Sequence, residues 1–546
     1  MTVPSDSPSG LDCVVVAGAL PQEFLGTKTR AEMRLHLDGV PASLNVLARH
    51  SAGQSGGDLS GLRQAFIGLN GPYLCQYLAD HGVRVARIDV LSQQQDEFAR
   101  LLAQRPRVVI LSTTFLPLAE QIDAIAQRIK EQAPWVTVVA GGPQVWKSYQ
   151  HLLLAEAGGI DQTIAATVAA HNYLMDRHRP SPVDILVVAR RGEAALAGLV
   201  CRLCADQPWQ DLPNLAWYDQ GAWQLGTRAE EEDLPVAIDW RRHPLPPGPI
   251  YLPVQAGQGC GFRCTFCDFC ALHPQVTMRD PQDVIDEIRT MPEHDGLRRV
   301  YFTDDNLFAT RTRAEAMLEA LIDSGMSVRW RGMLRVDMVD DHIADLLRRS
   351  GALEVLLGIE SGDPEILANM GKRLDPQRAL SGLAALDRHG INTKSFFIVG
   401  FPGETPASID RAIDFINAYP CQGPAVHRYT IFTFAPLPLA AIAQPAARRR
   451  WHLQGYGFRW RHATMDSDQA AQAMAAMFQR IKPDLSPSYP LEVPELPGLG
   501  PAELKRIYRL RSRLATLADA AQEPAMLAEL LAICAACDVT GLVSAG

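Results

Sequence analysis

The sequence has no long hydrophobic run, no secretion signal at its start and no excess of basic residues. No apolar stretch is long enough for a membrane-spanning helix, and residues 1–6 lack the basic and apolar parts of a signal peptide. Across 546 residues, 52 Lys and Arg stand against 61 Asp and Glu, a formal net charge of −9, which argues against a nucleic-acid partner. We therefore expect a cytoplasmic protein that binds neither membrane nor nucleic acid.

Cysteine is scarce, with 11 in the whole chain, yet three of them fall within eight residues as Cys260, Cys264 and Cys267. Without an export signal, such thiols favour metal ligation over disulfides. Three thiolates suit an iron–sulfur cluster that leaves one iron open, whereas a zinc site normally closes with four ligands. The alternative is a fortuitous cluster of cysteines or a partial zinc site.

Short apolar runs alternate with helical patterns over the first two hundred residues. The runs are 11–18, 83–90, 107–112, 136–140 and 183–188. This alternation predicts a doubly wound parallel sheet whose ligand lies at the C-terminal strand ends. Three of those ends carry small or polar residues, namely Ser112, Thr113 and Thr114, then Gly141, Gly142 and Pro143, then Gly192 and Glu193. Such residues allow a bulky flat ligand to approach the backbone.

The alternation resumes after the cysteines, at 299–306, 330–337, 353–362 and 393–404. It predicts a second parallel sheet with its site at the C-terminal strand ends. Carboxylates, amides and glycines near those ends can hold hydroxyl and ammonium groups of a ligand.

The cysteine spacing, with Phe266 directly before the last cysteine, resembles the radical S-adenosylmethionine (SAM) superfamily. The resemblance implies a partial (β/α)6 barrel and a 4Fe–4S cluster on Cys260, Cys264 and Cys267, whose fourth iron chelates SAM. It also implies that Phe266, Asp304, Arg335, Glu360 and Ser395 lie near the cluster or SAM.

A strand–helix domain upstream of such a motif resembles the cobalamin-binding radical SAM proteins. The resemblance implies that cobalamin lies across Ser112–Thr114, Gly141–Pro143 and Gly192–Glu193. One departure is that the chain lacks the Asp-x-His-x-x-Gly motif whose histidine ligates cobalt, and Gln144 follows Gly-Gly-Pro where relatives often carry histidine. Cobalt would then be bound without a protein imidazole.

The expected fold is α/β, with four parts. They are a Rossmann-like cobalamin-binding domain at 1–205, a linker at 206–246, a radical SAM domain at 247–440 and a mostly helical substrate or cap domain at 441–546. Residues 21–70 form a long insertion that either caps the cobalamin, lines the substrate site or is partly disordered. In the last part, Trp460-Arg461-His462-Ala-Thr464-Met465 is similar to an element of relatives of the phosphinate P-methyltransferases. Arg461 and His462 would suit an anionic substrate group.

Four other cysteines form two Cys-x2-Cys pairs, Cys201–Cys204 and Cys534–Cys537, in helical sequence where we expect packing residues. Cys270 follows the complete motif, and we interpret it as incidental or as a neighbour of the cluster.

The resemblance implies a methyltransferase that moves a methyl group from SAM, through methylcobalamin, to an unactivated carbon or a phosphinate centre. Two alternatives stay open: a ring rearrangement or cyclisation without methyl transfer, and a corrinoid-binding sensor or carrier without catalysis. The expected partners are a small-molecule or peptide substrate and an external electron donor such as flavodoxin or ferredoxin.

Overall fold

The computed structural model describes residues 10–18, 35–37, 40–51, 67–116, 118–230, 236–246, 248–273, 275–489, 492–496, 498–517 and 520–536. The chain folds into two compact units. The first consists of residues 1–25 and 66–243, and the second of residues 26–65 and 244–546. Among the described residues, no helix has the length and apolar character needed to cross a membrane.

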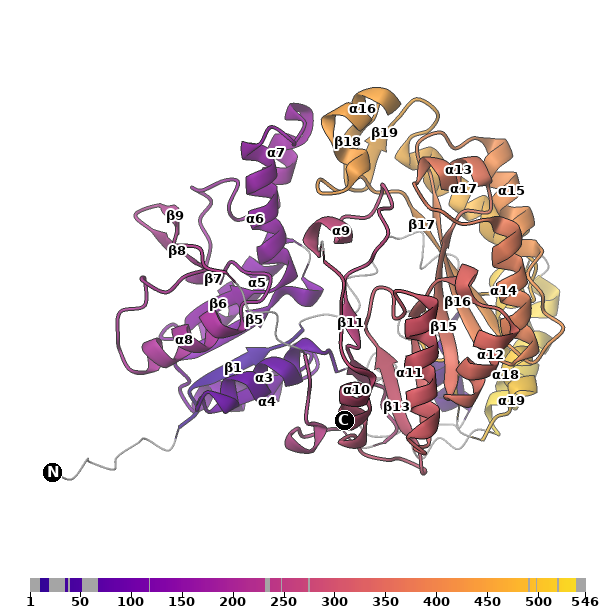
Figure 1. Cartoon of the computed structure of the whole chain (residues 1–546), viewed down its shortest axis with the longest axis horizontal. Helices are drawn as coiled ribbons and strands as arrows, with labels where there is room; N and C mark the ends of the chain where they lie inside the picture. The colour runs from indigo at the N-terminus through magenta and orange to yellow at the C-terminus, as the bar shows by residue number, and fades with distance from the viewer. Residues whose placement is uncertain are drawn as a thin grey trace. The chain divides into compact units, whose positions relative to one another are not determined.

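The first unit is a seven-stranded sheet in the order β4-β1-β5-β6-β7-β8-β9. Its first five strands are parallel: β1 (Cys13–Val16), β4 (Val85–Ile88), β5 (Val108–Ser112), β6 (Thr137–Gly141) and β7 (Ile185–Val187). The helices between them are α3 (Asn70–Asp80), α4 (Gln95–Ala103), α5 (Ala119–Gln132), α6 (Pro143–Glu156), α7 (Gln162–Ala170) and α8 (Glu193–Cys204) (Figure 1). This confirms the predicted doubly wound sheet. The direction in which successive strands are added reverses between β1 and β5.

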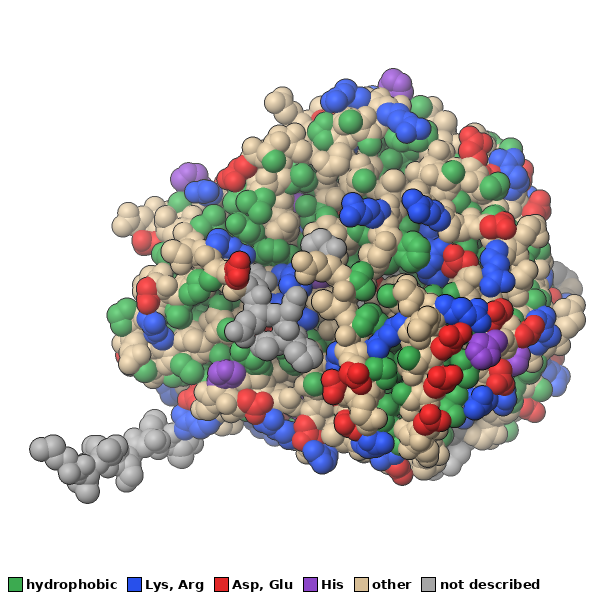
Figure 2. All heavy atoms as spheres, viewed as in Figure 1, with side chains coloured by type: hydrophobic (Ala, Val, Ile, Leu, Met, Phe, Trp, Pro, Cys, Tyr) green, Lys and Arg blue, Asp and Glu red, His purple; other side chains and the backbone are tan. Residues whose placement is uncertain are grey.

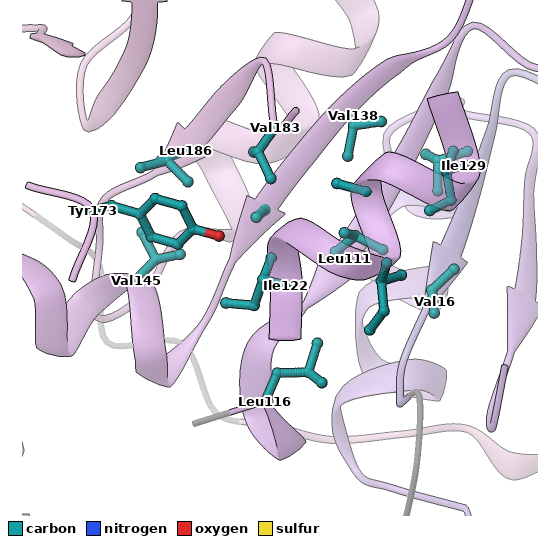
Figure 3. Packing of buried hydrophobic residues seen from close by; sticks show 14 of the residues in the cluster. Val16, Leu111, Leu116, Ile122, Ile129, Val138, Val145, Tyr173, Val183 and Leu186 are labelled. Atoms are coloured by element: carbon teal, nitrogen blue, oxygen red, sulfur yellow. The ribbon is translucent and has the colours of Figure 1, made fainter. Parts of the chain in front are cut away.

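Apolar side chains cover both faces of this sheet because helices pack on each side. On one face, Ile122 and Ile129 of α5 lie over Leu111 and Val138 of the central strands (Figure 3). On the other face, α3 and α8 pack with Leu78 and Leu199 against alternate residues of the same strands. A strand that is buried on both faces reads as a continuous apolar run, which is why the sequence predicted these strands.

The stretch 206–246, which we expected to be a linker, contains two further strands of the sheet. β8 (Leu215–Asp219) pairs antiparallel with β7, and β9 (Ala222–Leu225) pairs antiparallel with β8. Their connection turns through Gln220 and Gly221, both with positive φ (49° and 82°), as two-residue hairpin turns require. The first unit therefore extends beyond the expected boundary at 205.

The second unit is built on a parallel seven-stranded sheet in the order β10-β13-β14-β15-β16-β17-β20. The strands are β10 (Leu252–Val254), β13 (Arg298–Phe302), β14 (Val328–Leu334), β15 (Ala352–Glu360), β16 (Asn392–Val399), β17 (His427–Thr433) and β20 (Ser486–Pro487). The first six agree with the expected partial (β/α)6 barrel.

Helices line the outside of this partial barrel: α10 (Pro281–Arg289), α11 (Arg311–Asp323), α12 (Asp341–Arg349), α14 (Pro376–Arg388) and α15 (Pro406–Asn417) (Figure 1). The short α13 (Pro364–Asn369) follows β15. Over α12 and α14, acidic and basic side chains are interspersed (Figure 2), as in the Arg388–Asp341 ion pair. Asp, Thr or Ser side chains at several helix starts, such as Asp340 and Thr405, accept backbone N–H groups and fix where the helices begin.

The region after residue 440, expected as one cap, contributes to two different parts of the second unit. The η6 turn (Ala441–Ala443), α16 (Pro445–Trp451), the hairpin β18 (Gln454–Tyr456) and β19 (Arg459–Arg461), and α17 (Ser467–Arg480) contact residues that follow the C-terminal ends of β16 and β17. Later, β20 joins the sheet, and α18 (Pro501–Ala515) packs with α19 (Glu523–Cys534), which follows the η7 turn (Ala520–Gln522).

The insertion at 21–70 belongs mostly to this second unit. Its described part holds β2 (His36–Leu37), β3 (Val40–Pro41) and α2 (Leu44–Ser51). Leu44 and Leu47 of α2 pack with Leu504 and Leu530 of the C-terminal helices in one core. Helix α2 of the insertion therefore covers the C-terminal helices of the second unit. Residues 52–66, with the rest of the Gly- and Ser-rich stretch, lie outside the described residues, and residues 67–70 lead into α3 of the first unit.

Candidate functional sites

The polar and small residues at the predicted strand ends of the first unit surround one pocket, which holds about 640 Å³ of empty space including some open solvent. Six expected residues line it: Ser112, Thr114, Gly141, Gly142, Gly192 and Glu193. A Cβ on Gly141 would lie 3.2 Å from Val187, and one on Gly142 would lie 3.1 Å from Thr113 Oγ1. Glycine is therefore what leaves this edge open, which fits a large flat ligand such as cobalamin.

Two of the expected residues shape this pocket without lining it. The Thr113 hydroxyl donates to the Gly141 carbonyl (3.0 Å) and accepts the Gln144 N–H (3.1 Å), which locks the β6–α6 turn. Pro143 is the first residue of α6, where its fixed φ suits a helix start. Gln144 stands where some relatives carry histidine, and its Nε2 donates to the His171 carbonyl at 3.4 Å.

Three residues that sequence reasoning missed also line the pocket: Asn70, Tyr73 and Arg190. Asn70 Nδ2 donates to Ser112 Oγ at 2.7 Å and to the Ala17 carbonyl at 2.8 Å, so it ties α3 to two strand ends. Burial and the neighbouring Glu193 carboxylate raise the pKa of Tyr73, which keeps its hydroxyl protonated. Asn70 and Tyr73 were hidden behind the long insertion, which separates them from β1 in sequence.

The three cysteines of the second unit lie in a loop that a short antiparallel pairing closes. β11 (Gly257–Gln258) pairs with β12 (Thr277–Met278). Gly259 has φ +86°, and a Cβ there would lie 2.2 Å from the Gln275 carbonyl, so only glycine fits. Farther along, Thr265 N donates to the Met370 carbonyl (2.8 Å), which fastens the loop to the end of α13. The glycine-rich sequence thus builds a fixed bend around Cys260, Cys264 and Cys267.

All three thiols are partly buried, with Phe266 in the turn between Cys264 and Cys267. Desolvation raises the pKa of Cys264 and lifts that of Cys267 to about 12. Among the residues that the structure describes, no three His, Cys, Asp or Glu side chains are gathered closely enough to hold a metal ion. By donor chemistry, three soft thiols in one bend fit an iron–sulfur cluster better than a hard cation.

Cys270, in α9 (Phe269–Leu272), donates its thiol to the Phe262 carbonyl at 2.8 Å. It therefore stabilises the bend that carries the other cysteines. Cys534 is buried among the C-terminal helices, as expected for a packing residue, whereas Cys201 and Cys204 are exposed at the end of α8. Exposure contradicts the packing role expected for that pair. Cys537 lies outside the described residues.

Asp304 and Arg335 lie against the cysteine loop. Asp304 follows β13, and its Oδ2 accepts the Ala256 N–H at 3.1 Å, directly before the loop begins. Burial raises its pKa to about 7. The Arg335 guanidinium stacks 3.9 Å from the centre of the Phe262 ring and pairs with Asp337. Both residues therefore fix the loop, and Asp304 Oδ1 remains without a hydrogen-bond partner in the described structure.

Glu360 ends β15 beside Gly358, where the β15–β16 register shifts. Its backbone has φ +73°, an unfavourable conformation for glutamate, and its carboxylate pairs with Lys372 Nζ at 3.2 Å. Both charges influence the Cys264 thiol. A strained residue at a strand end is typical of functional sites. Lys372 was missed by sequence reasoning, although it follows the Met370-Gly371 turn that holds the loop.

The structure separates Ser395 from this group. Neighbouring residues Thr393 and Phe397, on the same face of β16, contact His427 and Phe415, and Ser395 itself is fully buried near Tyr419. Because side chains alternate along a strand, Ser395 faces the outer helices rather than the barrel interior.

Arg461 and His462, expected to bind an anionic substrate group, make contacts within the second unit. His462 stacks on Trp460, and its Nε2 donates to the Gly400 carbonyl at 2.9 Å, while Nδ1 lies 3.3 Å from Thr464 N. Both ring nitrogens are thus used within the fold. Arg461 is exposed and donates to Gln454 Oε1 at 2.8 Å.

Two family models match the chain. Residues 65–170 match the B12 binding domain, and residues 254–416 match the radical SAM superfamily. The first match contains the strand ends Ser112–Thr114 and Gly141–Pro143, and the second contains the cysteine loop and Glu360.

Among curated proteins, the chain is 24% identical to an uncharacterised methyltransferase of Pyrococcus horikoshii, over 64% of this chain and 74% of that protein. It is 23% identical to the anaerobic magnesium-protoporphyrin IX monomethyl ester cyclase of Rubrivivax gelatinosus, over 68% of this chain and 65% of the cyclase. Among solved structures, it resembles the radical SAM methyltransferase TsrM of Kitasatospora setae, determined with cobalamin and a [4Fe-4S] cluster. That match has a TM-score of 0.51 and 15% identity, covers 79% of this chain and 77% of TsrM, and shows a common fold.

Proposed function

This chain belongs to the cobalamin-binding radical SAM proteins, and we propose that it transfers a methyl group from SAM, by way of methylcobalamin, to an unactivated carbon or a phosphinate centre. The observation that carries the proposal is the presence of both sites in one chain. The glycine-edged pocket supports cobalamin binding, and the three-cysteine loop with Glu360 and Asp304 supports binding of a cluster and SAM.

When bound, the cluster and SAM supply a radical that activates the substrate, and methylcobalamin supplies the methyl group. The chain's own residues position these groups. Cys260, Cys264 and Cys267 would hold the cluster, while the ion pair with Lys372 would orient the Glu360 side chain beside it. Asn70 and Thr113 would keep the cobalamin pocket open by fixing its strand ends. Rigid support of this kind is what positioning two reactants requires.

A second candidate is a radical rearrangement or cyclisation without methyl transfer, which the similarity to the cyclase of Rubrivivax gelatinosus favours. The two are distinguished by the fate of the SAM methyl group. Isotopically labelled methyl appears in the product of a methyltransferase, whereas a rearrangement leaves the product unlabelled.

The remaining partners follow from the chemistry. A cluster that cleaves SAM needs one electron from outside, so we propose a flavodoxin or ferredoxin as donor and a cytoplasmic location where such donors operate. The substrate is a small molecule or a peptide.

The cluster assignment is tested by comparing Cys264→Ala with Cys270→Ala after anaerobic reconstitution. We expect Cys264→Ala to lose iron, inorganic sulfide and 5′-deoxyadenosine release. The variant should still bind cobalamin, because the proposed cobalamin pocket belongs to the first unit and Cys264 to the second. Cys270→Ala should retain the cluster, since Cys270 lies outside the three-cysteine motif and donates its thiol to the Phe262 carbonyl. Full SAM cleavage by Cys264→Ala would refute the ligand set.

A further inference from the structure

One lysine points into the partial barrel. Along β16, Thr393, Ser395 and Phe397 face the outer helices, so Lys394, Phe396 and Ile398 face the interior. Each of these three side chains retains accessible surface, whereas their outward neighbours are fully buried. The Phe396 ring lies 6.1 Å from that of Phe432 on β17, and Lys394 Nζ lies 5.6 Å from the Phe396 ring centre. Lys394 therefore faces the barrel interior and is less completely buried than its outward neighbours.

Below Lys394, the barrel floor carries more positive than negative charge. Glu354 of β15 pairs with Arg331 of β14 (2.8 Å) and with Arg428 of β17. Glu492 pairs with Arg428 (3.1 Å) and with Arg511 of α18 (2.7 Å). Three guanidinium groups thus share two carboxylates, so this buried cluster holds one more positive group than negative groups before Lys394 is counted.

No hydrogen bond or ion pair joins Lys394 to any residue that the structure describes. Burial, together with repulsion from Arg428 and Arg331, lowers the pKa of Lys394 to about 7, and the opposing effects of Glu354 and Glu492 are smaller. A protonated amine at this place would gain from an anion that is not part of the chain.

We propose that Lys394 binds an anionic group of the substrate, a carboxylate or a phosphoryl-type group, inside the partial barrel. This rests on the proposed function only in that the substrate enters the barrel. In this proposal Lys394 binds the anionic group that the sequence had assigned to Arg461 and His462. The side chains of those two residues bond to Gln454 and to the Gly400 carbonyl. The aromatic rings of Phe396 and Phe432 would contact the apolar part of the same substrate.

The test is site-resolved acetylation of the reconstituted full chain at pH 7 with a trace of acetic anhydride. A neutral lysine amine attacks the anhydride, an amide forms, and acetate and a proton leave. We expect inorganic phosphate to slow acetylation of Lys394 by about fivefold relative to chloride at equal ionic strength, because a bound anion stabilises the protonated, non-nucleophilic amine and shields it. Lys130, already paired with Asp184 at 2.6 Å, serves as the control that phosphate should not protect. Equal acetylation of Lys394 in phosphate and chloride overturns the proposal.

Two variants give an independent readout. Phosphate should raise the Tm of the wild type and of Lys394→Arg, which keeps the positive charge, but not of Lys394→Met. Equal shifts in all three overturn the proposal. Should Lys394→Met fail to fold, the acetylation result decides alone. Neither measurement requires turnover, so a chain that transfers no methyl group still reports whether Lys394 binds an anion.

Discussion

The ion pair between Glu360 and Lys372 holds a strained residue beside the cysteine loop. The backbone of Glu360 has φ +73°, which costs a non-glycine residue about 1–2 kcal/mol. Both side chains are largely buried, so losing one partner leaves the other charge unpaired. We predict that Glu360→Gln and Lys372→Met each lower the free energy of unfolding. The double variant should lose about 1–3 kcal/mol less than the sum of the two single losses. Urea denaturation of the three variants measures this coupling, and strictly additive losses would contradict it.

A second residue-scale prediction concerns pH. Glu404 is buried after β16 and accepts the Gly400 N–H, and burial raises its pKa from 4.5 to about 7. The folded state then holds a proton that the unfolded state has released between these two values. The contribution of Glu404 to stability is therefore fully present below pH 4.5 and is lost as the pH rises towards 7, by up to about 3 kcal/mol. Glu404→Gln removes this titration but keeps an oxygen acceptor. We expect the unfolding free energy of wild type minus variant to fall across that interval, whereas a constant difference would refute the pKa.

At the scale of elements, the hairpin β18–β19 fastens the turn that follows β16. His462 donates to the Gly400 carbonyl, and Trp460 donates to the Phe434 carbonyl at 2.6 Å. We predict that His462→Ala lowers the unfolding free energy by about 1–3 kcal/mol, because a buried carbonyl loses its donor. The exposed Arg461→Ala should change it by less than about 0.5 kcal/mol. Thermal denaturation of both variants checks this. An unchanged stability of His462→Ala would contradict this structural role and favour the substrate-binding role that the sequence predicted for His462.

The elements that could be predicted from sequence are those with strong local patterns. The buried parallel strands are apolar runs, the glycines around Cys260 mark a tight bend, and the small residues at 112–114 and 141–142 follow strands directly. The predictions that were wrong concerned features with weak local patterns or features set by pairing with other strands. The hairpin β8–β9 is short and flanked by prolines, and only its Gln220-Gly221 turn marks it. The face of β16 occupied by Ser395 depends on register, since a shift of one residue exchanges Ser395 and Lys394.

At the scale of the whole molecule, the chain crosses between its two units three times, near residues 25, 65 and 243. The described part of the insertion supplies Leu44 and Leu47 to the core of the C-terminal helices, and Leu44 N donates to Glu492 Oε2 at 2.9 Å. Each buried leucine contributes about 1.5–3 kcal/mol. The second unit is thus completed by residues that precede most of the first unit in sequence.

We therefore predict that a fragment of residues 244–546 is markedly less stable than one in which residues 26–65 are joined to it through a flexible linker. The fragment alone would expose the apolar side chains that α2 covers and leave Glu492 without the Leu44 N–H. The matched control is the linked fragment with Leu44→Asp and Leu47→Asp, which keeps the added length but cannot fill the core. Urea denaturation and gel filtration of the three fragments measure the difference. Equal stability of the fragment with and without the insertion would mean that the barrel and its C-terminal helices form an independent domain, as the sequence alone suggested.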